Sequence, residues 1–171
     1  LVVSVNASVR QLRDKEHFLS VVDDALKKYG ILAKNLEIEI TETIQMGPGD
    51  VAVETLHALR ARGVSVALDD FGTGYSNIAY LPHFPVDKLK FDRSLVLAGQ
   101  NSPHGKEILR TLAQLAFKLN MRVLAEGVEN DEQEAMLLDA GIEYMQGFKY
   151  AKPMPERAFL QLLLAQPRSV H

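Results

Sequence analysis

Hydrophobic and polar residues alternate along this chain with two different periods. Short apolar runs rich in β-branched residues are typical of strands, and six of them predict strands at Val2–Asn6, Leu36–Thr41, Val64–Asp69, Lys88–Phe91, Arg122–Glu126 and Ile142–Met145. Between these runs the apolar residues recur with helical spacing, which predicts amphipathic helices. The clearest helical stripe consists of Ile108, Leu112, Leu115 and Leu119.

Helix-ending signals separate the predicted elements. Gly30 and Gly63 follow the first two helical stripes, where glycine commonly ends a helix. Asn130 is a predicted N-cap and Gly141 a stop for a later helix, and a last helix is expected around Phe159. The chain is therefore predicted to be a train of strand–helix units.

Alternating strands and helices favour a parallel sheet with right-handed crossovers. An open doubly wound sheet and a (β/α) barrel both fit that pattern. No glycine-rich phosphate-binding motif follows the first strand, which counts against a dinucleotide-binding open sheet. Functional-looking residues fall at the C-terminal ends of the strands, where barrels place their active sites. Because a closed barrel has about eight strands, we expect a truncated (β/α)8 TIM-barrel-like fold of about six units that lacks roughly its first quarter.

Composition limits the class of protein. The 171 residues are 47% hydrophobic and 24% charged with a formal net charge of -3, which predicts a single globular domain over 1–171. Without an excess of basic residues, the chain gives no sign of nucleic-acid binding or of contact with a membrane surface. No apolar run is long enough to span a bilayer. Since there is no cysteine, disulfides and thiolate metal sites are excluded.

The segment Asp69–Asn77, Asp-Asp-Phe-Gly-Thr-Gly-Tyr-Ser-Asn, is the strongest chemical signal in the chain. Two adjacent carboxylates at the end of a strand repel each other unless a cation or a proton lies between them. The glycines allow the backbone to approach a ligand closely. Taken alone, the segment also fits an ordinary surface turn.

The alternation of side chains along strands gathers further polar groups at this end of the barrel. Four strands place a polar residue there on the inner face: Asn6, Glu39, Asp69 and Glu126. Asp70 is expected just past its strand, and Lys90 brings a cation to the same rim. Each has an ordinary alternative when considered singly, such as a turn residue for Asn6, a salt bridge for Glu39 and a solvated side chain for Lys90.

Oxygen ligands without cysteine or histidine favour Mg²⁺ or Mn²⁺ over Zn²⁺. Four carboxylates are enough for two cations, an arrangement that serves phosphoryl transfer. Lys90 would then position the attacking water or neutralise a phosphate.

At this point the residues resemble a known family, the EAL domain, a bacterial phosphodiesterase domain that acts on cyclic di-GMP. The resemblance covers the whole chain, and its most specific parts are the Asp69–Asn77 segment and Ala-Glu-Gly-Val-Glu at 125–129. The other matching segments are Ser4–Ser8, Glu39–Glu42, Leu89–Ser94 and Gln146–Phe148.

The resemblance implies a role for each matching residue. The implied ligands of two Mg²⁺ or Mn²⁺ ions are Asn6, Glu39, Asp69, Asp70 and Glu126, with Asp69 bridging the ions. Lys90 would orient the hydrolytic water, Gln146 would hold water or substrate, and Glu129 would support the site. Glu42 would brace the loop after Asp70. That loop, which includes Phe71, Gly72, Thr73 and Gly74, would couple dimerisation to metal binding.

The implied reaction is hydrolysis of one phosphodiester of cyclic di-GMP to linear pGpG. A cytoplasmic location follows from that substrate, in a parent protein that can be membrane-tethered. The family also implies a homodimer and upstream sensory or GGDEF domains.

The chain departs from the family in one respect, the segment Glu-Ala-Leu that gives the family its name. In the family this segment forms a strand and supplies a further metal ligand. It does not occur at the start of this chain, and Glu134-Ala135-Met136 lies inside a predicted helix. We therefore expect the natural protein to carry that segment further upstream. Three alternatives stay open: an effector that binds cyclic di-GMP without cleaving it, a protein-interaction module, and a two-metal enzyme for another phosphodiester.

Overall fold

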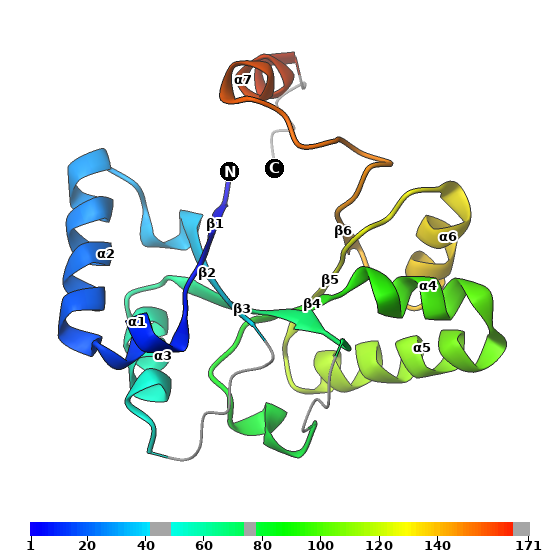
Figure 1. Ribbon diagram of the computed structural model, residues 1–171, viewed down its shortest axis with the longest axis horizontal. Coiled ribbons are helices and arrows are strands. Elements are labelled where there is room, and N and C mark those ends of the chain that lie inside the picture. Colours follow the sequence, from blue (N-terminus) through cyan, green and yellow to red (C-terminus); the bar gives the residue numbers. More distant parts are fainter. Residues whose placement is uncertain (42–48, 74–77, 166–171) are drawn as a thin grey trace.

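The computed structural model describes residues 1–41, 49–73 and 78–165, of which 78–80 are described by their backbone alone. Six parallel strands form one sheet in chain order, and the sheet curls into a half-barrel (Figure 1). They are β1 (Val3–Asn6), β2 (Leu36–Thr41), β3 (Ser65–Phe71), β4 (Lys88–Phe91), β5 (Arg122–Ala125) and β6 (Tyr144–Met145). The predicted TIM-barrel-like α/β architecture with six strands in the described chain is confirmed, although β3 is longer and β6 shorter than expected.

Two groups of helices lie on the outer side of this sheet. The first group packs beside β1–β3 and consists of α1 (Val9–Arg13), α2 (Lys15–Tyr29) and α3 (Val51–Ala61) (Figure 1). The second group, beside β4–β6, consists of α4 (Arg93–Asn101), α5 (Pro103–Lys118) and α6 (Asp131–Asp139). Two short 3-10 helices, Ala33–Asn35 and Ile78–His83, lie in connections, and α7 (Glu156–Ala165) follows β6.

The predicted helix ends are confirmed. Gly30, Gly63 and Gly141 all have positive φ angles of 63°, 85° and 82°, which glycine adopts without strain. The side chain of Asn130 accepts a hydrogen bond of 2.9 Å from the backbone of Gln133 and caps α6. Two helices were not predicted, α1 and α4, because each presents only a short apolar stripe.

The core lies between the outer face of the sheet and the helices. Outward-facing strand residues such as Ile38, Ile40 and Val123 are almost completely buried against helix residues such as Leu56 and Leu109. The inner face of the strands carries charged side chains instead. The alternation predicted from the sequence is therefore the one that the fold uses.

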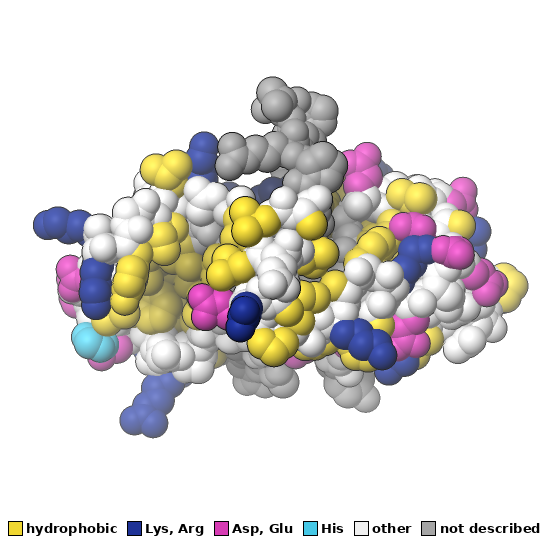
Figure 2. Space-filling model, turned by 90° about the horizontal axis from the view of Figure 1, so that it is seen from above, with side chains coloured by type: hydrophobic (Ala, Val, Ile, Leu, Met, Phe, Trp, Pro, Cys, Tyr) yellow, Lys and Arg dark blue, Asp and Glu magenta, His cyan; other side chains and the backbone are white. Residues whose placement is uncertain are grey.

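The edge strand β1 and helix α7 are exposed to solvent. Every residue of β1 is exposed, and Val3 keeps 53% of its surface accessible. Figure 2 looks onto the side where α7 lies and shows hydrophobic side chains gathered near its centre; α7 contributes exposed Phe159, Leu160, Leu162 and Leu164. Within the described ranges, no helix combines the length and apolar character that crossing a membrane requires.

Candidate active site

A local irregularity brings the two adjacent aspartates of β3 to the same edge of the sheet. Regular alternation would place Asp69 and Asp70 on opposite faces. Asp70 instead has φ 58°, a left-handed conformation that aspartate tolerates better than most residues. The register with β4 shifts between Leu68 and Phe71, and the Asp70 backbone donates a 3.0 Å hydrogen bond to the Asp69 carboxylate. Asp70 thus lies inside β3, one residue before its end, and not just past it as predicted.

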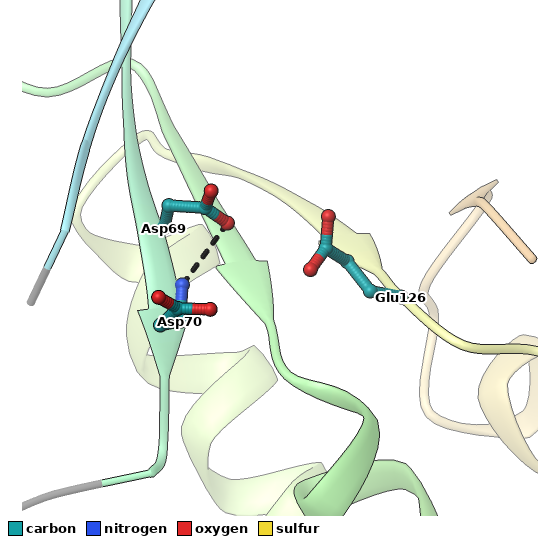
Figure 3. A group of neighbouring side chains, drawn as sticks. All are labelled: Asp69, Asp70 and Glu126. Carbon is teal, nitrogen blue, oxygen red and sulfur yellow. Dashed lines mark hydrogen bonds between the residues drawn. The ribbon is translucent and has the colours of Figure 1, made fainter. Parts of the chain in front are cut away.

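Glu126 completes a group of three carboxylates. It directly follows β5, and its backbone N–H donates to the carbonyl of Phe91 at 2.9 Å. Asp69, Asp70 and Glu126 each offer one oxygen, and the three oxygens lie within 4.8 Å of one another (Figure 3). Burial raises the pKa of the Glu126 carboxyl, while the Lys90 ammonium opposes that rise.

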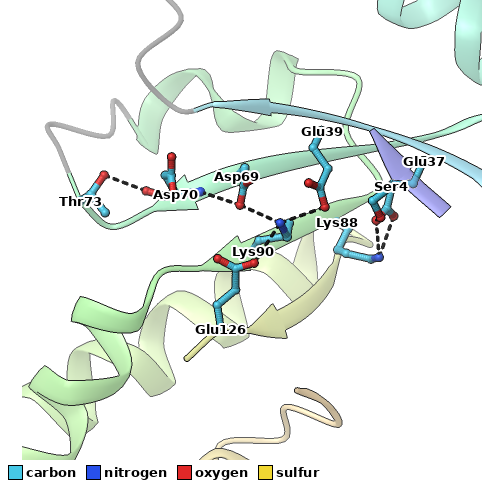
Figure 4. A network of polar contacts seen from close by, with 9 residues as sticks. All are labelled: Ser4, Glu37, Glu39, Asp69, Asp70, Thr73, Lys88, Lys90 and Glu126. Carbon is cyan, nitrogen blue, oxygen red and sulfur yellow. Dashed lines mark hydrogen bonds and ion pairs between the residues drawn. The ribbon is translucent and has the colours of Figure 1, made fainter. Parts of the chain in front are cut away.

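Lys90 lies at the centre of the acidic side chains. Its Nζ is 2.9 Å from oxygens of Glu39, Asp69 and Glu126 (Figure 4), and its side chain keeps 7% of its surface accessible. Burial lowers the pKa of Lys90, but the hydrogen bonds that its ammonium donates to the three carboxylates outweigh burial, so the pKa is raised. Lys90 is therefore a buried cation and not the solvated lysine of the ordinary alternative.

Glu39 and Asn6 lie on the neighbouring strands. Glu39 is buried in β2 and contacts Lys90, and it pairs in register with Asn6 of β1 and Ala67 of β3. Asn6 is exposed at the open edge of the sheet. The two residues share the C-terminal end of the strands with the three-carboxylate group but are not members of it.

The start of the loop after β3 is held by the backbone of Asp70. Both the N–H and the hydroxyl of Thr73 donate to the Asp70 carbonyl, at 3.3 Å and 3.0 Å. Phe71 is buried, and its ring stacks on Phe91 with 5.9 Å between centroids. Gly72 has φ 102°, which residues with a side chain rarely adopt. Glu42 and Gly74, the other predicted loop residues, lie outside the described residues.

Glu129 lies in the segment after β5, and Gln146 directly follows β6. Glu129 forms a 2.8 Å ion pair with Arg93. The backbone of Gln146 donates to Ala125 at 2.8 Å and accepts from Val128 at 3.0 Å, which places it beside the strand end that carries Glu126.

Two residues near the site were missed by sequence reasoning. Gln133, with 1% of its surface accessible, accepts a 2.7 Å hydrogen bond from the Glu129 backbone and donates to Gln100 at 2.9 Å. The spacing Asn130-x-x-Gln133 matches a capping box and is a signal that could have found it. The second residue, Arg93, packs closely against Gly127. A Cβ added to Gly127 would lie 2.5 Å from the Arg93 side chain, so glycine is required at position 127.

The residues present fit hard divalent cations. Three carboxylates, those of Glu39, Asp69 and Glu126, share the Lys90 ammonium, which leaves a formal excess of negative charge among these four described residues. Such an excess is costly in a half-buried site unless cations offset it. The donors are all oxygens, the ligands that Mg²⁺ and Mn²⁺ prefer.

The fold and the acidic site together define a half-barrel α/β domain with its site at the C-terminal ends of the strands. Comparison with known proteins identifies the family within this class. The family model described as the EAL domain matches residues 1–153. The chain belongs to the EAL domain family.

Individual relatives and solved structures support membership of this family. Cyclic di-GMP phosphodiesterase NbdA of Pseudomonas aeruginosa is 39% identical over 163 residues, which cover 95% of this chain and 21% of that protein. The crystal structure of the EAL domain of Mycobacterium smegmatis DcpA superposes with a TM-score of 0.89 at 35% identity, covering 96% of this chain and 73% of that one. A manganese and cyclic di-GMP complex of Klebsiella pneumoniae BlrP1 gives a TM-score of 0.79 at 32% identity, covering 86% and 38%. The chain spans about a fifth of the length of the first curated relatives that it matches.

Proposed function

We propose that this chain forms the catalytic part of a phosphodiesterase that hydrolyses one phosphodiester of cyclic di-GMP to give pGpG. The observation that carries the proposal is the convergence of Asp69, Asp70 and Glu126 on one edge of the sheet. Membership of the EAL family and the name of the relative NbdA support the substrate and the reaction.

Two Mg²⁺ or Mn²⁺ ions would be held by Asn6, Glu39, Asp69, Asp70 and Glu126. When bound, such ions lower the pKa of water and neutralise charge on a phosphodiester. The manganese in the BlrP1 complex supports the choice of metal.

The other residues of the chain act around these ligands. Lys90 holds Asp69 and Glu126 in place through its ion pairs, and its ammonium is near enough to the cluster to orient a water molecule for attack. Gln146 would contact water or substrate, and Glu129 would support the β5 end. Glu42 would brace the loop that contains Phe71, Gly72, Thr73 and Gly74. A homodimer, upstream sensory or GGDEF domains and a cytoplasmic location are part of the same proposal.

Incubation with cyclic di-GMP and Mn²⁺ tests the reaction directly, with pGpG quantified by chromatography. The 171-residue chain is assayed beside a longer protein that carries the family's Glu-Ala-Leu segment ahead of β1, because that segment would supply a further metal ligand. Product from either protein, lost on Asp69→Asn, supports hydrolysis. Tight cyclic di-GMP binding without product in both would replace the enzyme with a binding effector.

A further inference from the structure

A second buried ion pair lies beneath the acidic site. Lys88 Nζ is 2.6 Å from one Glu37 oxygen and 2.8 Å from the other, and the Ser4 hydroxyl donates to Glu37 at 3.0 Å (Figure 4). The Glu37 side chain keeps 3% of its surface accessible and that of Lys88 keeps 13%. A charge pair this deeply buried is costly to maintain unless it is fully paired.

The pair repeats the acidic site one step lower in the barrel. Glu37 precedes Glu39 by two residues in β2, and Lys88 precedes Lys90 by two in β4, so all four side chains point inward. The two layers are separated by about 7 Å along the strands.

A small residue in the strand between allows the lower pair to form. Ala67 of β3 pairs in register with Glu39 on one side and with Lys88 on the other. Because alanine does not fill the inner face, side chains from β2 and β4 meet above it. The Glu37–Lys88 contact crosses β3 diagonally, because Glu37 pairs in register with Ser65 and Lys88 with Ala67, and it lies one step below the Glu39–Lys90 contact.

We propose that Glu37 and Lys88 are positioning residues that keep Lys90 on the carboxylates of the metal site. This inference rests on the proposed function and deepens it. Each layer contains an anion and a cation, and at this spacing either carboxylate of β2 can attract either lysine of β4. While Lys88 neutralises Glu37, Lys90 is left to Glu39, Asp69 and Glu126.

The two single variants have opposite expected effects on metal affinity. Lys88→Gln leaves the Glu37 carboxylate unpaired, which draws Lys90 away from the upper carboxylates, so Mn²⁺ binds about fivefold more tightly. Glu37→Gln leaves the Lys88 ammonium to compete for Glu39, so Mn²⁺ binds about fivefold more weakly. The double variant is neutral again and binds Mn²⁺ within about twofold of the wild type.

Electron paramagnetic resonance of free Mn²⁺ measures these affinities without substrate or turnover. The matched control is the exposed ion pair of Lys15 and Glu54, which has a 2.9 Å contact on α2 and α3; Lys15→Gln and Glu54→Gln leave the Mn²⁺ affinity unchanged. A purely structural pair would lower the melting temperature in both variants without opposite shifts in affinity. Shifts of the same sign, or none, overturn the positioning role.

Steady-state kinetics provide the second readout. Because Lys90 leaves its place in Lys88→Gln, kcat falls about tenfold while KM stays within about twofold. If one single variant does not fold, the remaining one compared with the double variant still isolates one charge. Opposite affinity shifts without hydrolysis by any version would refute the proposed reaction and retain the positioning role, whereas hydrolysis with unshifted affinities would refute the positioning role alone.

Discussion

Lys90 Nζ lies 2.9 Å from Asp69 Oδ1, and that same Asp69 oxygen accepts a hydrogen bond from the backbone of Asp70. Asp69 therefore connects a buried cation on β4 with the left-handed residue that ends the regular part of β3. A change at Lys90 therefore acts on Asp69 as well as on Glu126, and through Asp69 on the backbone of Asp70.

Lys90→Ala is expected to abolish hydrolysis while leaving metal binding intact or stronger. Removal of the ammonium exposes three carboxylates to one another, so the metal-free variant loses about 3 kcal/mol of folding stability. Mn²⁺ should restore much of that loss because it supplies the missing positive charge. Thermal melts with and without Mn²⁺ measure both effects, and a variant equally stable in both conditions would contradict the electrostatic role of Lys90.

Asp69→Asn is expected to lower Mn²⁺ affinity and hydrolysis by at least about a hundredfold. Asparagine keeps an oxygen that can accept the Asp70 hydrogen bond, so the turn should persist and the melting temperature should change little without metal. Isothermal titration with Mn²⁺ measures the affinity. Asp23→Asn, at an exposed ion pair with Arg62, is the matched control and should bind Mn²⁺ as the wild type does. An Asp69→Asn variant that binds Mn²⁺ normally would remove Asp69 from the ligand set.

Gly72→Ala is expected to destabilise the loop after β3. The backbone at φ 102° is strained for alanine, and the added Cβ would lie 3.4 Å from Leu95. We expect a loss of about 1–3 kcal/mol in the free energy of unfolding and weaker Mn²⁺ binding, because Asp70 is two residues away. Thr73→Ala, which removes one hydroxyl hydrogen bond to the Asp70 carbonyl, should cost less. Urea denaturation ranks the two variants, and the reverse order would contradict the backbone argument.

The sequence predicts which strands contribute side chains to the site but not the local geometry of those side chains. Alternation along β2, β3 and β5 predicts that Glu39, Asp69 and Glu126 share one face, since the period of a strand is fixed by its backbone. The left-handed backbone of Asp70 is not visible in that period, because it depends on the register shift against β4. The burial of Lys90 likewise depends on three carboxylates from other strands, so no local pattern distinguishes it from a surface lysine.

Two helices, α1 and α4, also could not be predicted from the hydrophobic period of the sequence. Helix α1 begins with a capping box between Ser8 and Gln11, and α4 with Asp92, whose side chain accepts from the Ser94 backbone at 2.8 Å. Both caps are readable in the sequence, but the helices that follow have few buried residues. Their stability comes from packing on neighbouring helices, which a sequence period does not show.

Folding stability should depend on pH through Asp50. Its carboxylate accepts from the Ala52 backbone at 3.0 Å, which caps α3, and pairs with Arg13 at 2.7 Å. The hydrogen bond from Arg13 and the backbone bond hold the pKa of Asp50 below its usual range. A lowered folded-state pKa stabilises the fold above the unfolded value of about 3.9, and this stabilisation is lost as the pH falls through the folded pKa.

Asp50→Ala should therefore cost about 1 kcal/mol at neutral pH, a typical value for a lost cap. The difference from the wild type should shrink as the pH falls below about 4. Chemical denaturation at pH 7 and pH 3 measures it. A difference that is the same at both values would show that the charge of Asp50 contributes nothing.

Gln133 is expected to hold the segment that carries Glu126 and Glu129. Its side chain bridges the Glu129 backbone and Gln100, and it is buried. Gln133→Leu keeps a similar volume but leaves the Glu129 N–H without its acceptor, so we expect a loss of about 1–3 kcal/mol. Since this N–H lies three residues beyond Glu126, Mn²⁺ affinity should fall as well. Gln100→Ala removes the more exposed partner and should affect stability but not Mn²⁺ binding; equal effects of the two variants on Mn²⁺ would show that Gln133 acts on the fold alone.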